Sequence, residues 1–404
     1  MWKKLENLYE LHQHISGAVG AKDLFNLIIE QQLHEKEPDK LDEEFKKRFG
    51  VENFSELIKN SPKEAEKTLY EKFCKFEDTI LTDTNEFRNK ITARYGFSFY
   101  VTSNPKIRRK ISKQICETFY EQGIKYLELR AVSFKPGITS EDTPWDQLSE
   151  SVYGMIDAKD NLPGFDFSYI IGIARHHFVD KDNKPDENKI KHAENILRFL
   201  VKKLEKNDDI AQYVLGIDAT DKEVLPPRYL KNIFEIAIES GLIPVPHAGE
   251  NFKSIEEGIQ NIYEYIDILE AKRIGHALAA CVDPRKYLGK NDEYGKLYTK
   301  SRVEKIIELQ DDLIKYMKER SIVVETCPTS NIITLGLKSY EEHPIRRFLD
   351  SGVNVVICSD SSGIYGITLK DEIKNIAVAQ NFSLAELEKV LENSRKYSLK
   401  NLVS

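Results

Sequence analysis

The chain has 404 residues, of which 41% are hydrophobic, 10% aromatic and 31% charged. This composition supplies a large apolar core and a well-solvated surface, and it excludes a globally disordered chain. At roughly 150 residues per domain the length corresponds to one or two domains, because an α/β barrel with insertions can use a chain of this size as one unit.

The net charge of -7 comes from 59 basic and 66 acidic side chains, and the sequence has no long basic run. We therefore do not expect nucleic acid as a partner. Residues 1–16 lack the apolar centre of a signal peptide, and no 18 uncharged apolar residues follow one another. The five cysteines are widely spaced without a C-x-x-C pair, which fits reduced thiols. We expect a soluble, cytoplasmic protein without a membrane segment.

From about residue 124 onward, short apolar and β-branched runs alternate with longer charged stretches of helical periodicity, which is typical of repeated βα units. Eight runs are predicted strands: residues 8–14, 124–132, 165–175, 213–220, 243–250, 273–278, 322–328 and 353–360. Eight strands joined by returning helices predict an α/β fold of the (β/α)8 TIM-barrel type. An open doubly wound sheet is the alternative.

Residues 20–123 separate the first two predicted strands and are expected to be helical. Apolar spacing predicts helices over 21–36, 63–76 and 105–122, and a further amphipathic helix over 303–318. Loops that follow barrel strands stand over the active-site end, so we interpret 20–123 as a helical lid on a single 1–404 barrel. The alternative is an appended helical subdomain without contact to the site.

Polar residues that can bind a metal or move protons end several predicted strands, and the carboxyl ends of barrel strands open onto one face. The first strand ends in His12-Gln13-His14. Alternate residues of a strand point to the same side, so both imidazoles can bind a single cation. Two ordinary surface or hydrogen-bonded core histidines are the alternative for this pair.

Three further strand ends carry such residues. The fifth strand ends in residues 246–250 (PHAGE), whose glycine permits a tight turn. Alternatively, Glu250 complements the dipole at a helix N-terminus. The sixth strand supplies His276, and the eighth supplies Asp360, which could instead cap the next helix. Three histidines and an aspartate together suit zinc or a similar divalent cation, leaving His276 and Glu250 for acid–base chemistry.

The strand ends belong to an ordered series of short motifs: residues 11–17 (LHQHISG), 126–130 (YLELR), 216–218 (GID), 247–250 (HAGE), 273–276 (RIGH), 327–331 (CPTSN), 343–345 (HPI) and 359–360 (SD). In these motifs the chain resembles the adenosine deaminase-like family of metal-dependent aminohydrolases, within the amidohydrolase superfamily. The series covers most of the chain, from the first strand to the eighth, in the order of the family.

The resemblance implies one zinc ion per chain, held by His12, His14, His247 and Asp360. It also implies that Glu250 protonates a purine ring nitrogen while water activated at the ion attacks the amino-bearing carbon, so that ammonia leaves. His276 would help to deprotonate or orient that water, and Asp360 would share its proton. The P-C-x-x-C half of the cytidine-deaminase type of zinc pattern is absent, since Cys327-Pro328 is not followed by a second cysteine.

Departures from the family concern the substrate. Members typically carry aspartates where this chain has Ser16 and Ser361, and a glycine where it has Asp221. The resemblance implies substrate contacts at His14, Ser16, Asp221, Gly249 and Ser361. Because charge differs at three of these positions, a modified adenine nucleoside, an adenine-containing metabolite or another aminated ring stays open beside adenosine.

We therefore predict a zinc-dependent hydrolytic deaminase that converts adenosine or a related aminopurine nucleoside into the inosine-type keto product and ammonia. Hydrolysis of an ester or cyclic amide is one alternative, against which the placement of Glu250 argues. A catalytically silent metal-binding protein is another, although it would be expected to have lost Glu250 or a metal ligand. His176 and His177 are interpreted as ordinary polar residues, since neighbours on a strand face opposite ways.

Overall fold

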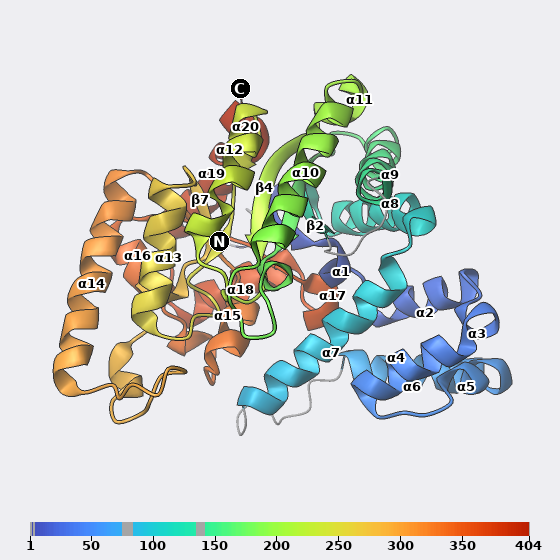
Figure 1. The fold of residues 1–404 in the computed structure, drawn as a ribbon, viewed down its shortest axis with the longest axis horizontal. Helices are drawn as coiled ribbons and strands as arrows, with labels where there is room; N and C mark the ends of the chain where they lie inside the picture. Colours follow the sequence, from blue (N-terminus) through green and yellow to red (C-terminus); the bar gives the residue numbers. More distant parts are fainter. Residues whose placement is uncertain (1, 3–4, 75–83, 135–141, 404) are drawn as a thin grey trace.

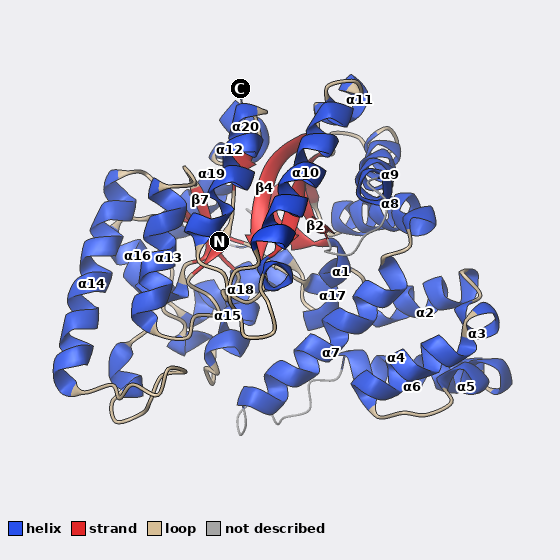
Figure 2. Cartoon of the chain, in the orientation of Figure 1, coloured by secondary structure: helices blue, strands red, loops and turns tan. Residues whose placement is uncertain are grey.

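The structure, a computed structural model, describes residues 2, 5–74, 84–134 and 142–403. Its strands form two parallel sheets surrounded by helices (Figures 1 and 2). One sheet has the order β1-β2-β3-β4-β5, with bounds Leu8–His14, Ile124–Phe134, Asp166–Ala174, Val214–Thr220 and Ile243–Pro244. The other has the order β6-β7-β8-β9, with bounds His247–Ala248, Arg273–His276, Val323–Thr326 and Asn354–Ile357. Parallel pairing in chain order confirms the predicted α/β class.

The two sheets are connected through the first and the last strand of the chain. A parallel bridge joins Gln13 of β1 to Asp360, just beyond β9. A buried cluster also combines residues of both sheets: Leu11 of β1, Tyr126 of β2, Val323 of β8 and Val356 of β9. The first and last strands therefore direct side chains into a common interior, as in a TIM-type fold.

The fifth predicted strand is interrupted, which corrects the expectation of one continuous run over 243–250. Its halves are β5 and β6, separated by Val245 and Pro246. The N–H of Val245 still donates to Ile217 O of β4 at 2.9 Å, whereas Pro246 accepts at its carbonyl from Gly275 N at 2.8 Å. Proline has no N–H to continue the ladder, so the chain changes partner from β4 to β7 at this point.

Helices follow the strands and pack on their outer side. They are α9 Asp142–Lys159, α10 Glu187–Leu204, α11 Asp208–Ala211, α12 Lys231–Glu239, α13 Ile255–Asp267, α14 Lys300–Glu319, α15 Pro328–Leu335, α16 Ile345–Ser351, α17 Ser362–Tyr365, α18 Leu369–Ala379, α19 Leu384–Lys396 and α20 Leu399–Val403. Helix α14 confirms the amphipathic helix predicted over 303–318. Side-chain caps at Ser254, Thr368 and Ser383 fix the starts of α13, α18 and α19.

The described part of the segment between β1 and β2 is helical. Its helices are α1 Ile15–Ala18, α2 Ala21–Glu30, α3 Leu33–Lys36, α4 Pro38–Phe49, α5 Phe54–Asn60, α6 Pro62–Cys74, α7 Thr84–Thr102 and α8 Pro105–Glu121. Figure 1 shows α2 to α6 gathered at the lower right, with α7 running diagonally from them towards the lower centre of the view. The single helix predicted over 21–36 is wrong, because the chain breaks at Gln32, whose φ is 56°. Residue 76, the expected end of the second helix, lies outside the described residues.

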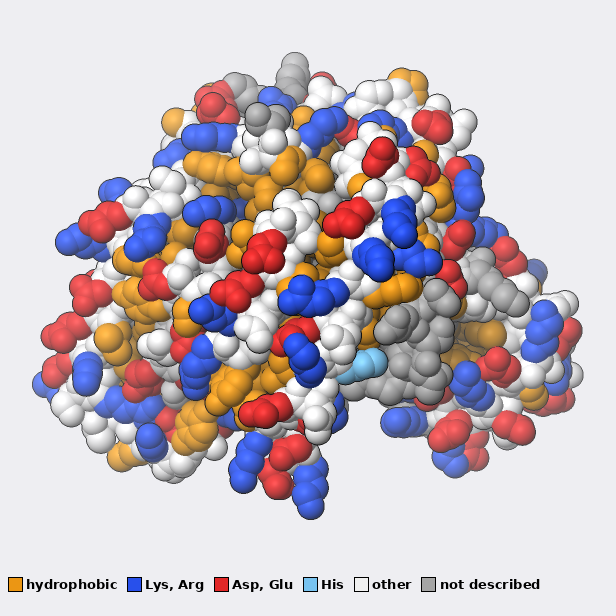
Figure 3. Space-filling model, turned by 45° about the horizontal axis from the view of Figure 1, so that its top comes forward, with side chains coloured by type: hydrophobic (Ala, Val, Ile, Leu, Met, Phe, Trp, Pro, Cys, Tyr) orange, Lys and Arg blue, Asp and Glu red, His pale blue; other side chains and the backbone are white. Residues whose placement is uncertain are grey.

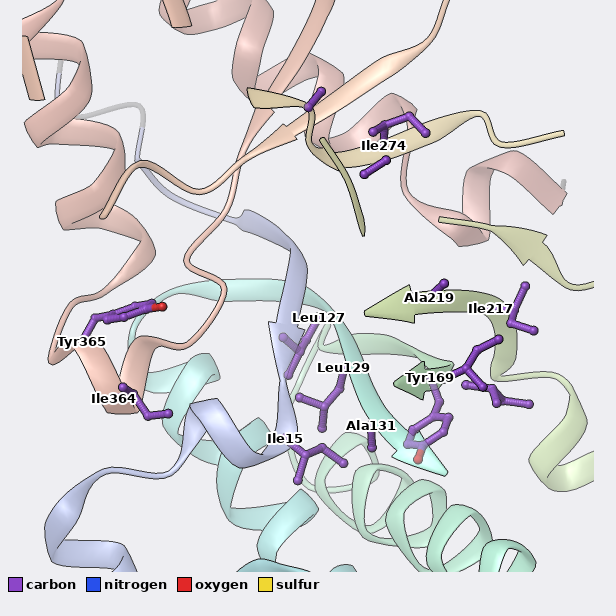
Figure 4. Packing of buried hydrophobic residues seen from close by; sticks show 14 of the residues in the cluster. Ile15, Leu127, Leu129, Ala131, Tyr169, Ile217, Ala219, Ile274, Ile364 and Tyr365 are labelled. Atoms are coloured by element: carbon purple, nitrogen blue, oxygen red, sulfur yellow. The ribbon is translucent and has the colours of Figure 1, made fainter. Parts of the chain in front are cut away.

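The core is apolar, whereas the surface carries both charge signs. Ile15 of α1 and Leu127, Leu129 and Ala131 of β2 are buried in the main cluster (Figure 4). Lysine, arginine and acidic side chains are interspersed over the face in Figure 3. Among the described residues, none of the helices has the length and hydropathy required to cross a bilayer.

Candidate metal centre and active site

Three histidines from two sheets converge where β1 and β6 end. The Nε2 atom of His247 lies 3.0 Å from Nε2 of His12 and 3.1 Å from Nε2 of His14. His14 Nε2 also lies 3.6 Å from Oδ1 of Asp360. The structure therefore brings together the four residues proposed as metal ligands, which stand up to 348 positions apart in the chain. Alternation along β1 places His12 and His14 on the same side, as predicted.

Buried carboxylates fix the orientation of two of these rings. Glu325 of β8 accepts from Nδ1 of His12 at 2.6 Å, and Asp218 of β4 accepts from Nδ1 of His247 at 2.9 Å. A neutral imidazole has one N–H, so each ring presents an unprotonated Nε2 to the other. Burial lowers the pKa of His12 and of His247 well below the usual histidine value, and neighbouring positive charges add to this effect. Both rings are therefore neutral at pH 7.

This donor set fits a divalent metal ion. Unprotonated nitrogens only 3.0 Å apart repel one another unless both bind a cation, and imidazole nitrogen with carboxylate oxygen suits zinc. The carboxylate–histidine pairs at Glu325 and Asp218 are the usual support of metal-binding histidines. Among the described residues, His12, His14 and Asp360 also form one group whose candidate ligand atoms lie within 4.8 Å of one another.

Arg130 of β2 connects the two supporting carboxylates. Its Nη1 donates to Asp218 at 3.2 Å and its Nη2 donates to Glu325 at 3.1 Å. Arg273 of β7 donates to the other oxygen of Glu325 at 2.7 Å and forms an ion pair with Glu128. These side chains are at most 1% exposed, so their charges require partners. These hydrogen bonds hold Glu325 and Asp218 in place beside the histidines.

Glu250 is the carboxyl group expected to move a proton, and it lies beside His276. Its Oε2 is 3.8 Å from Nε2 of His276, while its Oε1 accepts from Thr334 at 3.3 Å. Burial raises the pKa of Glu250 to about 7, and the negative charge of Glu223 adds to the rise. A carboxyl group with this pKa is protonated in about half of the molecules at neutral pH, as a proton donor requires.

A carboxylate that no predicted motif includes holds the loop at Glu250. Glu223, 2% exposed, accepts from the backbone N–H groups of Gly249, Glu250 and Asn251 at 3.1, 2.6 and 3.1 Å, and from Asn261 Nδ2 at 2.9 Å. Gly249 has φ of 64°, which confirms the tight turn expected there. Three consecutive N–H groups directed at one carboxylate fix the position from which the side chain of Glu250 departs.

Glu250 and Asp360 do not have the alternative roles at helix N-termini that the sequence left open. The helix that follows Glu250 is α13, whose N-cap is Ser254, so Glu250 lies outside its first turn. The N-cap of α17 is Ser361 rather than Asp360, and no side-chain cap hydrogen bond is formed there. Instead, Asp360 has φ of 59° and accepts from Ser361 Oγ at 3.1 Å.

The expected substrate contacts lie in different surroundings. Ser361 is fully buried, and its Oγ forms a hydrogen bond with Tyr95 Oη of α7. Ser16, half-buried in α1, accepts at its carbonyl from Ser98 of α7. Asp221 lies after β4, with φ of 70°. Asp221 forms an ion pair with His176 that the sequence did not predict.

The structure corrects one premise of the interpretation of the His176-His177 pair, its placement on a strand. Both residues lie on the 3-10 helix Arg175–Phe178 rather than on a strand, and their rings are in contact, tilted by 46° with centroids 3.9 Å apart. Nδ1 of His176 lies 2.5 Å from Oδ2 of Asp221, and both side chains are about two-fifths exposed. Burial raises the pKa of Asp221, but the hydrogen bond and charge of His176 outweigh it and lower that pKa to about 2.

Comparison with known proteins identifies the family. The family model described as adenosine deaminase matches residues 60–401. The chain is 22% identical over 387 residues to adenosine deaminase of Clostridium acetobutylicum, covering 95% of this chain and 90% of that protein. Its fold matches the N6-methyl-AMP deaminase of Arabidopsis thaliana with a TM-score of 0.66 at 17% identity, covering 100% and 96% of the two chains.

A zinc-bound amidohydrolase from Burkholderia ambifaria has the same fold, with a TM-score of 0.63 at 17% identity and coverage of 96% and 84%. These likenesses confirm the TIM-barrel prediction over the open doubly wound sheet. With 342 of its residues matched by the family model, the chain belongs to the adenosine deaminase family.

Proposed function

We propose that the protein, a metal-dependent hydrolytic deaminase by its family, removes the amino group of adenosine or a related adenine compound with zinc as its metal. One observation supports this most strongly: three Nε2 atoms and a carboxylate converge beside Glu250, a mostly buried side chain whose pKa is raised to about 7. Hydrolytic deamination needs this combination of a cation site and a proton donor.

His12, His14, His247 and Asp360 would hold the ion. Zinc in such a site acts as a Lewis acid that makes water a nucleophile near neutral pH. Nitrogen-rich ligands favour zinc over magnesium or calcium, and the structural relative from Burkholderia ambifaria binds zinc. Glu325 and Asp218 would keep the His12 and His247 rings in the orientation that leaves Nε2 free.

Glu250 would donate a proton to a nitrogen of the substrate ring. Protonation withdraws electrons from the adjacent amino-bearing carbon, which makes that carbon open to attack by water. Thr334 donates to one carboxyl oxygen at 3.3 Å and Asn251 to the other at 2.8 Å, so the carboxyl group is oriented on both sides. Loss of the amino group as ammonia then gives the keto product.

The helical segment would serve as a lid over this centre. Tyr95 of α7 forms its hydrogen bond with Ser361, the residue directly after the ligand Asp360, and Ser98 of the same helix contacts the segment after His14. Helix α7 also contacts α15 and α17. These contacts support a lid rather than an appended subdomain without contact to the site.

The proposed substrate is a small molecule with an adenine ring, but its polar part differs from what the family pattern suggests. Ser16 and Ser361 are neutral hydrogen-bonding groups, and Asp221 has its charge paired with His176. A substrate that differs from adenosine at the sugar or the amino group would fit the changed residues at positions 16, 221 and 361.

The test is an ammonia-release assay on the zinc-loaded protein with adenosine, 2′-deoxyadenosine, N6-methylated adenine nucleosides and nucleotides, AMP, adenine and guanine. N6-methylated substrates are followed through release of methylamine. We expect turnover of at least one adenine compound and loss of turnover after zinc removal. A fully zinc-loaded, folded protein that acts on none of them would contradict the proposal.

A further inference from the structure

We propose that Asn331 and His343 are positioning residues that hold His276 as the tautomer with its proton on Nε2. His276 then acts as a hydrogen-bond donor to the reacting oxygen, and it is neither a base towards that oxygen nor a metal ligand. This inference rests on the proposed function for its catalytic meaning, but the tautomer itself can be measured without turnover.

The first step is the orientation of the Asn331 amide, a residue of α15. The backbone N–H of Cys327 donates to Oδ1 of Asn331 at 3.3 Å. A backbone N–H can only donate, so the atom that faces it must be the amide oxygen. The other terminal atom is therefore the nitrogen, Nδ2, and it lies 2.8 Å from Nδ1 of His276.

His343 fixes the same orientation from the opposite side. The backbone N–H of Ile345 donates to Nδ1 of His343 at 3.1 Å, which makes this nitrogen an acceptor. Burial lowers the pKa of His343 to about 3, so the ring is neutral and its single proton is on Nε2. That Nε2 lies 3.2 Å from Oδ1 of Asn331, to which it donates.

The state of His276 follows from these two anchors. Nδ2 of Asn331 has only N–H groups to offer, so Nδ1 of His276 must accept and cannot carry a proton. A neutral imidazole then carries its proton on Nε2.

The Nε2–H of His276 has no hydrogen-bond partner within the described structure, although this atom is fully buried. It is directed into the candidate centre: the His276 ring lies 5.1 Å from the His12 ring and 5.0 Å from the His247 ring, centroid to centroid. A buried donor without a partner is costly, so it is expected to meet an acceptor during function. The oxygen that attacks the substrate ring is such an acceptor.

The tautomer separates three roles that the residue type alone leaves open. An unprotonated Nε2 would allow His276 to bind the metal or to take a proton from water, whereas a protonated Nε2 allows neither. The proton of the attacking water would therefore pass to a group other than His276.

The direct test is nitrogen-15 NMR of the zinc-loaded protein labelled at histidine. The His276 signals are assigned by their loss in His276→Phe. We expect Nδ1 of His276 to show the shift of an unprotonated nitrogen and Nε2 that of a protonated nitrogen. An unprotonated or metal-bound Nε2 would overturn the inference, and this result does not depend on whether a substrate is turned over.

Two substitutions at Asn331 provide a second test. In Asn331→Asp the side chain keeps its shape but, when ionised, can only accept, so His276 Nδ1 must be protonated; a ring that stays neutral then has no proton on Nε2. Asn331→Ala imposes neither tautomer. We expect kcat to fall by at least about 10²-fold in Asn331→Asp, as for loss of an oriented donor, and less in Asn331→Ala. KM and zinc content are expected to stay within a few-fold of the parent protein.

A merely structural role predicts the reverse order, because the aspartate preserves shape and the alanine leaves a cavity. The matched control is Asn393→Asp on α19, another buried asparagine whose Nδ2 donates to Val355 O at 3.0 Å. It buries the same charge away from the site and is expected to keep kcat. If Asn331→Asp does not fold, the wild-type spectrum alone decides between the two tautomers.

Discussion

The carboxylate of Glu223 accepts a hydrogen bond from the backbone N–H of Glu250 at 2.6 Å, so one acidic residue holds the main chain of another. The contact has two effects of different kind. It fixes the loop from which Glu250 reaches the centre, and its negative charge adds to the burial that raises the pKa of Glu250 to about 7. Position and protonation state of the proposed proton donor thus depend on the same neighbour.

Replacement of this neighbour is expected to lower stability and turnover together. In Glu223→Gln one acceptor oxygen becomes an NH2 group that faces backbone N–H donors, which costs about 1–3 kcal/mol of unfolding free energy. We expect a lower Tm and a lower kcat with zinc content unchanged. Glu239→Gln, an exposed change of the same type on α12, is the control and should leave both quantities unaltered. Equal behaviour of the two variants would refute the role assigned to Glu223.

The pH profile of kcat/KM is expected to fall on its alkaline side. Glu250 must be protonated to act as an acid, and the protonated fraction decreases as pH rises through its pKa of about 7. Activity should thus be retained below pH 7 and decline above it. In Glu223→Gln the decline should begin at lower pH, because removal of a negative charge lowers the pKa of Glu250. A profile that rises from pH 6.5 to 8.5 would exclude Glu250 as the acid.

Glu250→Gln should separate proton transfer from metal binding. The amide keeps the shape of the carboxyl group but has no proton of suitable acidity, so we expect kcat to fall by about 10²–10⁴-fold. Zinc content and Tm should change little, because the ligands and the Glu223 contacts remain. Steady-state kinetics with elemental analysis on the same sample measures both. Retention of parent-like kcat would show that another group supplies the proton.

Glu325→Gln should weaken metal binding without removing a ligand. The carboxylate accepts from His12 Nδ1 at 2.6 Å and thereby keeps Nε2 unprotonated and basic. Loss of such a support typically lowers metal affinity by about 10–100-fold. Competition with a chelator measures this shift. Glu257→Gln, at a half-buried position of α13 whose carboxylate accepts from Lys253 and Tyr294 rather than from a histidine, serves for comparison and should bind zinc like the parent protein.

Most of the architecture was accessible from the sequence because strand and helix periodicity are local properties. Each of the eight predicted runs contains a strand, although the fifth is divided. The α/β class and the meeting of His12, His14, His247 and Asp360 were predicted correctly. Errors arose where one residue redirects the backbone. Pro246 divides the fifth strand, and Gln32, with positive φ, divides the first long helix.

The carboxylates that orient the site residues, Glu223 and Glu325, were harder to find from the sequence. Glu223 lies in no motif, and Glu325 sits within an apolar strand, where a charge gives no indication of its partner. Their roles depend on contacts with residues 26 to 313 positions away. Burial was a usable signal: an ionised side chain in an otherwise apolar strand needs an opposite charge or several N–H donors. The His176–Asp221 pair escaped because the third strand ends one residue before Arg175.

Anomalous diffraction at the zinc absorption edge, from crystals of the zinc-loaded protein, tests the central claim most directly. We expect one peak per chain, bounded by the Nε2 atoms of His12, His14 and His247 and by the carboxylate of Asp360, with Nε2 of His276 outside bonding distance. A peak coordinated by other residues, or full deaminase activity in a protein without a peak at this place, would contradict the account.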